Sequence, residues 1–361
     1  MEVQQQNTGA DNEVSQEKKK VDTIYILWLS TGLGCDGCTI SVAGATNPSL
    51  EDVLGGRIPG LPRVVLIHPV LAVEAGEELV SYYEKAAKGE LGPYVVVLEG
   101  SVPDESIAER TGGWWAALGF DKKRNKPITT SEWLKRLAPN ALAVIAIGTC
   151  AAWGGIPAAR GNPTNAMGLL EFLGPDYRSK LGLPIINVPG CPPQGDNFMK
   201  TVAMIILYAI GLAPPPELDE LGRPKFAYGD TNRQACPRAG YAEEGNFARE
   251  FGDKECLLSL GCWGPVVKCN VNKVGWINGV GGVTNMGGPC IGCTMPGFPD
   301  AFSPFYTPTF RHKLSMISDR LGLPGLIKRV GRDLTLKLET DTNPRWKRKK
   351  LRLELMKMSG R

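Results

Sequence analysis

Ten cysteines, spread over 361 residues, constrain the fold of this chain more than any other feature of its sequence. They occur as a C-x-x-C pair, two isolated cysteines, and a later group of six that ends in a second C-x-x-C pair. In chain order they are Cys35, Cys38, Cys150, Cys191, Cys236, Cys256, Cys262, Cys269, Cys290 and Cys293. Thiolate sulfur is a soft ligand that suits iron-sulfur clusters, and three or four cysteines make one such site. The series therefore supplies ligands for three clusters and predicts a protein that conducts electrons.

Two other uses of cysteine compete with clusters. Disulfide-stapled scaffolds are short secreted chains, whereas this long chain is 43% hydrophobic and can build an ordinary core. Zinc is the closer alternative, because C-x-x-C pairs are also parts of zinc ribbons. Its weakness is that Cys150 and Cys191 are single cysteines that follow apolar runs, far from any second pair. Iron-sulfur clusters are therefore favoured.

The start of the chain is polar, and its end carries a run of basic residues. Residues 1–20 are polar, without an apolar signal core or an arginine pair, so residues 1–21 are predicted to be a disordered tail and the protein to be cytoplasmic. Basic residues gather in 345–352, where a solvated tail is favoured over a nucleic-acid or lipid patch.

The longest apolar stretch, 202–213, is shorter than the ~20 residues that cross a bilayer, so it predicts a buried helix and no transmembrane segment.

Residues 22–222 alternate strand-like and helix-like segments. The strand-like segments are 24–29, 63–67, 94–98, 141–147 and 184–188, and plausible helices cover 72–88 and 131–137. Continuous rather than alternating hydrophobicity indicates strands that are buried on both faces, as in a parallel sheet covered by helices. The predicted fold class is α/β, with a flavodoxin-like doubly wound parallel sheet.

The cysteines of this first region follow predicted strands. Cys35 and Cys38 follow the first strand, Cys150 the fourth and Cys191 the fifth. Ligands of an open parallel sheet collect outside the carboxyl ends of its strands, so we expect these four thiols to meet at one edge and to form one 4Fe-4S site. Glycines around them would let the backbone approach the sulfides.

Periodicity fades after residue 222. Residues 280–289 and their neighbours are rich in turn residues, which predicts an irregular cysteine-rich iron-sulfur domain over 223–310. Few apolar runs occur there, so metal binding should contribute to its folding.

Residues 311–361 form a C-terminal extension, in which 334–338 and 351–355 alternate with period two and predict a hairpin. A lone hairpin is marginally stable in water, so we expect it to pack on a partner or on another copy of the complex.

Six motifs together carry a family resemblance. They read L-S-T-G-L-G-C-D-G-C, V-V-L-E-G-S-V-P, A-I-G-T-C-A-A-W-G-G-I, V-P-G-C-P-P, L-G-C-W-G-P and P-C-I-G-C-T-M-P-G-F-P-D. In this order, over about residues 24–300, they resemble the small subunit of nickel-iron hydrogenases. The resemblance implies a proximal, a medial and a distal cluster, and a large subunit that holds the nickel-iron centre.

The resemblance also implies a ligand set for two clusters. The proximal 4Fe-4S cluster takes Cys35, Cys38, Cys150 and Cys191, and the medial 3Fe-4S cluster takes Cys269, Cys290 and Cys293. Oxygen-tolerant membrane-bound members of the family place two extra cysteines at the positions of Gly37 and Gly155. An ordinary four-cysteine proximal cluster is therefore expected.

The distal cluster departs from the family pattern. The resemblance assigns it Cys236, Cys256 and Cys262, but Arg233 stands where the family usually has a histidine ligand. A guanidinium cannot ligate iron, so Asp230 is predicted as the fourth ligand, with an Asx-turn role as the alternative. Water, or a three-iron cluster without a fourth ligand, also stays open. A carboxylate ligand should lower the reduction potential.

Several residues near these motifs invite a functional interpretation. Glu99 is a candidate for a proton or electron path beside the proximal cluster, but a helix-capping or ion-paired carboxylate is favoured. Trp28, Trp153 and Trp263 are expected to pack and exclude water rather than to assist tunnelling. His68 is expected to be structural.

The resemblance implies an oxidoreductase whose large subunit splits H2 while this chain passes the electrons on, with no catalytic residue of its own. The acceptor is expected to be a quinone or a redox protein, and the complex a higher-order oligomer of heterodimers, attached to a membrane only through the complex. The pattern resembles the soluble actinobacterial-type uptake hydrogenases. Two alternatives are the small subunit of an H2-sensing hydrogenase and a complex I-like cluster subunit, which has adjacent cysteines that this chain lacks.

Overall fold

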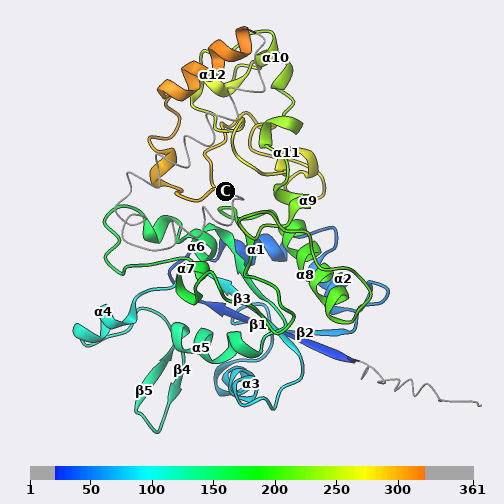
Figure 1. Ribbon diagram of the computed structural model, residues 1–361, viewed down its shortest axis with the longest axis vertical. Coiled ribbons are helices and arrows are strands. Elements are labelled where there is room, and N and C mark those ends of the chain that lie inside the picture. The colour runs from blue at the N-terminus through cyan, green and yellow to red at the C-terminus, as the bar shows by residue number, and fades with distance from the viewer. Residues whose placement is uncertain (1–20, 322–361) are drawn as a thin grey trace, which may run out of the picture.

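A five-stranded parallel sheet forms the centre of the first two-thirds of the chain (Figure 1). The computed structural model describes residues 21–321. The strands of the sheet are β1 (Thr23–Ser30), β2 (Arg63–Ile67), β3 (Tyr94–Glu99), β6 (Val144–Ile147) and β7 (Ile186–Val188). Their order is β2-β1-β3-β6-β7, which is the flavodoxin-like order. The predicted fold class is confirmed.

Helices cover both faces of the sheet. One face packs against α3 (Gly76–Lys88), α5 (Thr130–Leu137), α6 (Gly148–Trp153) and α7 (Leu169–Leu173). The other packs against α1 (Gly37–Ala43), α2 (Leu50–Leu54) and α8 (Gly195–Ala209). Successive strand residues point to opposite faces, so Leu98 belongs to the first core and Val97 to the second. Every residue of β3 and β6 is buried, which explains their unbroken apolar runs.

Some predicted boundaries differ from those of the structure. The strand predicted over 141–147 begins at Val144, and the one predicted over 184–188 begins at Ile186. The buried helix predicted over 202–213 is α8, which begins earlier because the Gln194 side chain caps it by accepting a hydrogen bond from the Asn197 N–H at 2.7 Å. It ends at Ala209 rather than 213.

Several short elements of the structure were not predicted from the sequence. A two-stranded antiparallel hairpin consists of β4 (Ala117–Asp121) and β5 (Lys126–Thr129), and α4 (Glu105–Arg110) precedes it. Most residues of β4 are exposed or half-buried, so the segment has no apolar run to mark it. Two 3-10 turns, Ala138–Asn140 and Ile156–Ala158, complete this region.

The cysteine-rich region, residues 223–310, is irregular as expected (Figure 1). Its helices are α9 (Lys225–Tyr228), α10 (Ala239–Glu243) and α11 (Val271–Val274), and its 3-10 turns are η3 (Asn232–Ala235), η4 (Leu257–Leu260) and η5 (Asp300–Phe302). The next helix, α12 (Phe310–Arg320), crosses the predicted boundary at residue 310 and contacts α10 and η4. The domain boundaries at 222 and 310 stay predictions.

Two predicted segments lie outside the described residues. They are nearly all of the N-terminal tail over 1–21 and the hairpin over 334–355. Among residues 21–321, no helix combines the length and the apolar character needed to cross a bilayer.

Candidate iron-sulfur cluster sites

All ten cysteines lie among the described residues and none of them forms a disulfide, so the disulfide alternative is wrong. Cys262 and Cys290 are buried, Cys35 and Cys191 are exposed, and the others are half-buried. Within residues 21–321, no three side chains of His, Cys, Asp or Glu converge tightly enough to chelate one metal ion. The charge interactions and hydrogen bonds between the thiols show instead which of them lie near one another.

The first group lies at the carboxyl ends of the parallel strands. Cys35 is in the loop after β1, Cys38 is in α1, Cys150 is in α6 directly after β6, and Cys191 is in the loop after β7. Burial, then the charge of Glu99, and then the charges of the other three cysteines raise the pKa of the Cys38 thiol. The structure thus brings together the four thiols that the sequence assigned to the proximal cluster.

Glycines allow the backbone to pass close to these sulfurs. A Cβ atom at Gly148, which has a φ of +80°, would lie 2.4 Å from the Sγ of Cys38. At Gly155, with a φ of +50°, it would lie 2.9 Å from the Sγ of Cys150. Only glycine adopts such a conformation at no steric cost. Position 155 therefore has no room for a side chain unless the backbone moves.

Glu99, at the end of β3, caps the helix that carries Cys38. The carboxylate Oε1 accepts a hydrogen bond from the Thr39 N–H at 3.0 Å, and Oε2 accepts from the Trp28 Nε1–H at 3.0 Å and from the Thr39 hydroxyl at 2.5 Å. Thr39 lies in the first turn of α1, where a negative charge stabilises a helix. This is the capping role that the sequence analysis favoured, in a carboxylate that also lies close enough to raise the Cys38 pKa.

His68 contacts the same helix through the side chain of Thr39. Its Nδ1 accepts hydrogen bonds from the N–H groups of Val70 at 2.9 Å and Leu71 at 3.1 Å, so the pattern assigns the ring proton to Nε2. Nε2 lies 3.1 Å from the Thr39 hydroxyl oxygen, which in turn donates to Glu99. Burial lowers the pKa of His68 to about 4, and the ring is neutral at physiological pH. His68 is structural, as expected.

The three tryptophans near the motifs are packed in cores. The ring of Trp28 lies 5.5 Å from that of Phe198, and the ring of Trp263 lies 5.0 Å from that of Phe302, both edge to face. Trp153 is buried in the core on the other face of the sheet. All three positions fit the predicted packing role.

The second group consists of Cys269, Cys290 and Cys293. Burial is the largest cause that raises the pKa of each of these thiols, to about 12 for Cys293. The charge of Cys262, and then those of Cys293 and Cys269, raise the pKa of Cys290 further. The positive charge of the Arg223 guanidinium lowers the pKa of Cys269 and so opposes the effect of burial. This arginine is fully buried and forms an ion pair with Asp219 at 2.8 Å. The positive charge beside these thiols is therefore neutralised by a carboxylate.

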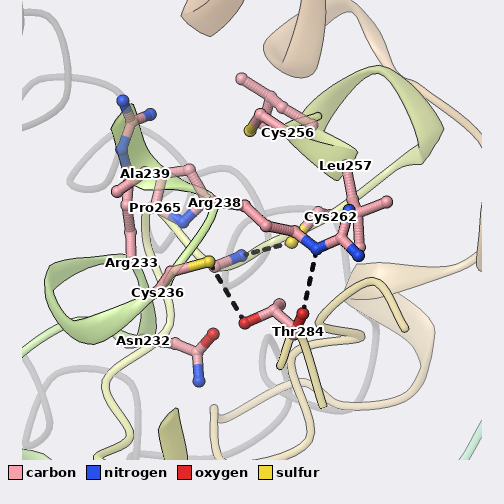
Figure 2. Close-up of a pocket in the computed structure, with 12 residues that line it drawn as sticks. Asn232, Arg233, Cys236, Arg238, Ala239, Cys256, Leu257, Cys262, Pro265 and Thr284 are labelled. Carbon is pink, nitrogen blue, oxygen red and sulfur yellow. Dashed lines mark hydrogen bonds between the residues drawn. The ribbon is translucent and has the colours of Figure 1, made fainter. Parts of the chain in front are cut away.

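The third group lines a cavity (Figure 2). Cys236, Cys256 and Cys262 face it from three separate segments, and Asn232 and Thr284 add polar atoms to its wall. Burial raises the pKa of Cys262 to about 11, and the charges of the other two thiols contribute to the shift. These are the three cysteines that the sequence assigned to the distal cluster.

Asp230 does not line this cavity. Its side chain is exposed, and its carbonyl oxygen accepts a hydrogen bond from the Cys269 N–H at 3.1 Å. Arg233, in the position of the usual histidine ligand, does line the cavity. The assignment of Asp230 as the fourth distal ligand stays a prediction.

Backbone N–H groups link the three groups of thiols end to end. The backbone N–H of Cys191, in the first group, lies close enough to Cys293 in the second to lower the pKa of that thiol. The N–H of Cys290, in the second group, donates to the Sγ of Cys262 in the third, with 3.3 Å between nitrogen and sulfur. The groups therefore follow one another in the order first, second, third.

The thiols fit iron-sulfur clusters in number and in surroundings. Sets of four, three and three match the ligand requirements of such clusters, and N–H groups already point at several of the sulfurs. The raised thiol pKa values mean that iron must displace protons when it binds, so binding releases protons and is linked to folding.

Sequence reasoning missed the polar residues around the second and third groups. Arg223, Asn232, Asn272 and Thr284 are all buried, and none was singled out. The signal was faint, because asparagine and threonine in a glycine-rich segment usually indicate turns. Only their burial distinguishes them.

Two protein families match the chain over successive segments. Residues 35–205 match the family described as "NADH ubiquinone oxidoreductase, 20 Kd subunit", and residues 228–306 match the family of the C-terminal part of the "NiFe/NiFeSe hydrogenase small subunit". The periplasmic [NiFeSe] hydrogenase small subunit of Desulfomicrobium baculatum is 32% identical over 303 residues, which cover 82% of this chain and 90% of the relative. The chain belongs to the nickel-iron hydrogenase small subunits.

Other small subunits agree with this assignment. The hydrogenase-2 small chain of Escherichia coli K12 is 36% identical over 281 residues, 75% of this chain and 67% of the relative. Among solved structures, the actinobacterial-type NiFe-hydrogenase from Ralstonia eutropha H16 superposes with a TM-score of 0.80 at 51% identity, over 90% of this chain and 93% of that one. The Ni-Fe-Se hydrogenase of Desulfomicrobium baculatum gives a TM-score of 0.70 at 32% identity, over 78% and 98%.

Membership fixes the coarse function of the chain. It is the electron-transfer subunit of a hydrogenase, an oxidoreductase, and small subunits of this family carry iron-sulfur clusters. It pairs with a large subunit, which holds the nickel-iron centre. The complex I-like alternative is wrong, because the family match continues through residues 228–306.

Proposed function

We propose that this chain is the small subunit of an uptake hydrogenase and passes electrons from H2 through three clusters in a row. The observation that carries the proposal is the end-to-end contact of the thiol groups, Cys191 to Cys293 and Cys290 to Cys262. Adjacent ligand sets of this kind support a relay of closely spaced centres. When bound, the clusters supply one-electron oxidation and reduction. The chain holds them, shields them and donates hydrogen bonds to their sulfurs.

The number of thiols in each group sets the proposed cluster types. The proximal site, with four thiols, takes a 4Fe-4S cluster. The medial site, with three thiols and no fourth cysteine, takes a 3Fe-4S cluster. The distal site takes a 4Fe-4S cluster if Asp230 or water completes its three thiols, and a 3Fe-4S cluster if nothing does.

The exposed end of the proximal group is the proposed docking face for the large subunit. Cys35 is exposed, and Ile40 and Val70 are both 69% exposed although they are apolar. The hydrogen bond between Thr39 and His68 joins the two segments that carry these side chains. An exposed apolar patch beside an exposed ligand cysteine is what a buried subunit interface would cover.

The finer features of the complex are also proposals. The 51% identity to an actinobacterial-type hydrogenase supports an uptake enzyme of that type. We propose a cytoplasmic complex that reaches a membrane only through its partners, donates to a quinone or a redox protein, and assembles into an oligomer of heterodimers.

Purification of the intact complex tests the central proposal. We expect a nickel-bearing large subunit to co-purify, and a potentiometric titration followed by EPR to resolve three cluster transitions. Rapid H2-driven dye reduction would separate an uptake enzyme from an H2 sensor. A complex without iron, or with one transition, would refute the relay.

Single substitutions test the ligand groups. Cys35→Ser, Cys293→Ser and Cys262→Ser should each change a different transition and leave the other two detectable. Loss of the same signal in two of these variants would contradict the three groups.

The fourth distal ligand is tested separately with Asp230→Ala. If Asp230 binds iron, the distal transition changes in potential and line shape. An unchanged distal signal removes it from the site.

A further inference from the structure

Thr284 occupies an unusual place beside the distal thiols. It belongs to a glycine-rich loop, yet its side chain is only 1% exposed. Its hydroxyl oxygen lies 3.2 Å from the Sγ of Cys236, and in Figure 2 the side chain points toward that sulfur. A threonine hydroxyl is therefore buried against a predicted cluster ligand.

Two neighbours fix the position of this threonine. The Nδ2 of Asn272 donates to the Thr284 hydroxyl oxygen at 2.5 Å and also to the Oδ1 of Asn232 at 2.9 Å. The Nε of Arg238 donates to the backbone carbonyl of Thr284 at 3.1 Å. The same guanidinium also donates to the carbonyl oxygens of Asp253 and Glu255, the segment that leads to Cys256. Thr284 is thus held at both its side chain and its backbone.

The direction of the hydrogen bond to sulfur follows from these contacts. A protonated Cys236 can donate to the hydroxyl oxygen, but a cysteine that ligates iron is a thiolate and has no proton to give. The Thr284 oxygen already accepts from Asn272, so its own proton is the one that remains to be placed. Among the described residues, Cys236 Sγ is the acceptor in reach.

We infer that Thr284 donates a hydrogen bond to the Cys236 thiolate and thereby raises the reduction potential of the distal cluster. Hydrogen bonds to cluster sulfurs stabilise the more negative, reduced state, and they are one of the levers that set cluster potentials. Asn272 is a positioning residue, since it turns the hydroxyl toward the sulfur. The inference rests on the proposed function, because it needs a cluster at Cys236, Cys256 and Cys262.

Potentiometric EPR titration of the intact complex tests the inference with Thr284→Val, which replaces the hydroxyl by a methyl of similar size. The distal transition should shift to lower potential, while the proximal and medial transitions stay in place. Thr284→Ser keeps the hydroxyl and should restore the wild-type value. Thr201→Val is the matched control, since Thr201 is equally buried but donates to the carbonyl of Asn197 in α8.

A second measurement does not depend on the potential. In deuterium oxide, pulsed EPR of the reduced distal cluster should show an exchangeable deuteron in the wild type and in Thr284→Ser, and a weaker deuteron signal in Thr284→Val. If the valine variant loses iron, Thr284→Ala removes the hydroxyl without adding a methyl group and takes its place.

The outcomes distinguish the proposed role of Thr284 from the proposed three-cluster function on which it rests. A wild-type complex without a distal cluster overturns both. A wild-type complex with three transitions, and a Thr284→Val variant whose distal potential and deuteron signal are unchanged, overturns the role of Thr284 alone. A serine variant that shifts as far as the valine variant would also overturn it, because packing rather than the hydroxyl would then set the potential.

Discussion

The sheet region of residues 22–222 and the cysteine-rich region of residues 223–310 are stabilised in different ways. Two large apolar cores, one on each face of the sheet, hold the first region together. The second has a single smaller core, to which the proposed cluster ligands Cys262 and Cys290 themselves belong. In the sheet region the proposed ligands lie at the edge of a fold that is already complete. In the cysteine-rich region they are part of the core.

This difference teaches where iron contributes to folding. Burial of apolar side chains stabilises the sheet whether or not a cluster is present. The cysteine-rich region has short helices and 3-10 turns that would be marginal alone. Coordination of the proposed clusters there would add to the free energy of folding directly.

Removal of iron should show the difference between the two regions most strongly. Structural metal sites contribute on the order of 10 kcal/mol, so a complex prepared from iron-starved cells should lose structure in residues 223–310 and keep it in the sheet region. Hydrogen exchange followed by mass spectrometry measures this as amide protection. Equal protection of both regions, with and without iron, would show that the cysteine-rich region folds without metal.

A cavity in the sheet core should have the next largest effect. Leu98 is fully buried, so Leu98→Ala should lower the free energy of unfolding of the sheet region by about 2–5 kcal/mol. Leu212→Ala is the control, since Leu212 is 65% exposed. Denaturant titration measures the loss, and the potentials of the medial and distal clusters should not move. A shift in those two potentials would mean that the two regions are not independent.

Acid should destabilise the sheet region through His68. The folded-state pKa of about 4 lies below the ordinary value of 6.5, so below pH 6.5 the unfolded chain binds a proton that the folded chain does not. The free energy of unfolding should therefore fall as pH decreases from 6.5 to 4, by at most about 1.4 kcal/mol per pH unit and about 3 kcal/mol in total.

Comparison with a variant isolates the contribution of His68 to this pH dependence. His68→Asn places an amide oxygen near the position of Nδ1, does not titrate, and should give a flatter curve of stability against pH. Parallel curves for the two proteins between pH 4 and 6.5 would contradict the prediction.

The smallest effect is expected at a helix cap of the sheet region. Ser49 and Asp52 form a reciprocal capping box at the start of α2, so Ser49→Ala should cost about 1 kcal/mol. Ser81→Ala, inside α3, should cost nothing measurable, because alanine favours helices. Thermal melting compares the two variants, and equal melting temperatures would show that the cap does not contribute.

Burial explains which parts of the fold the sequence predicted. Strands β1, β2 and β3 were predicted to within two residues at each end because apolar runs mark strands buried on both faces. The hairpin of β4 and β5 was missed because only one of its nine residues, Ile128, is buried. Patterns of hydrophobicity report contact with a core, so an element with little such contact leaves little pattern.

The candidate sites divide in a similar way. The positions of Cys35, Cys150 and Cys191 after strands predicted one shared site, because the topology of a parallel sheet fixes where strand ends meet. The contact of Thr284 with Cys236 could not be predicted, since it joins residues 48 positions apart in irregular chain. No local rule places such residues side by side.

The two N–H groups that connect neighbouring sites belong to the main chain. A substitution at Cys191 or Cys290 removes a thiolate but keeps the amide, and only proline deletes it. Evolution can therefore exchange the ligands of one centre for other donors while the backbone continues to hold the next centre beside it. The order of the proposed clusters would then be kept when their ligands change, and the reduction potential of each cluster could change independently of the others.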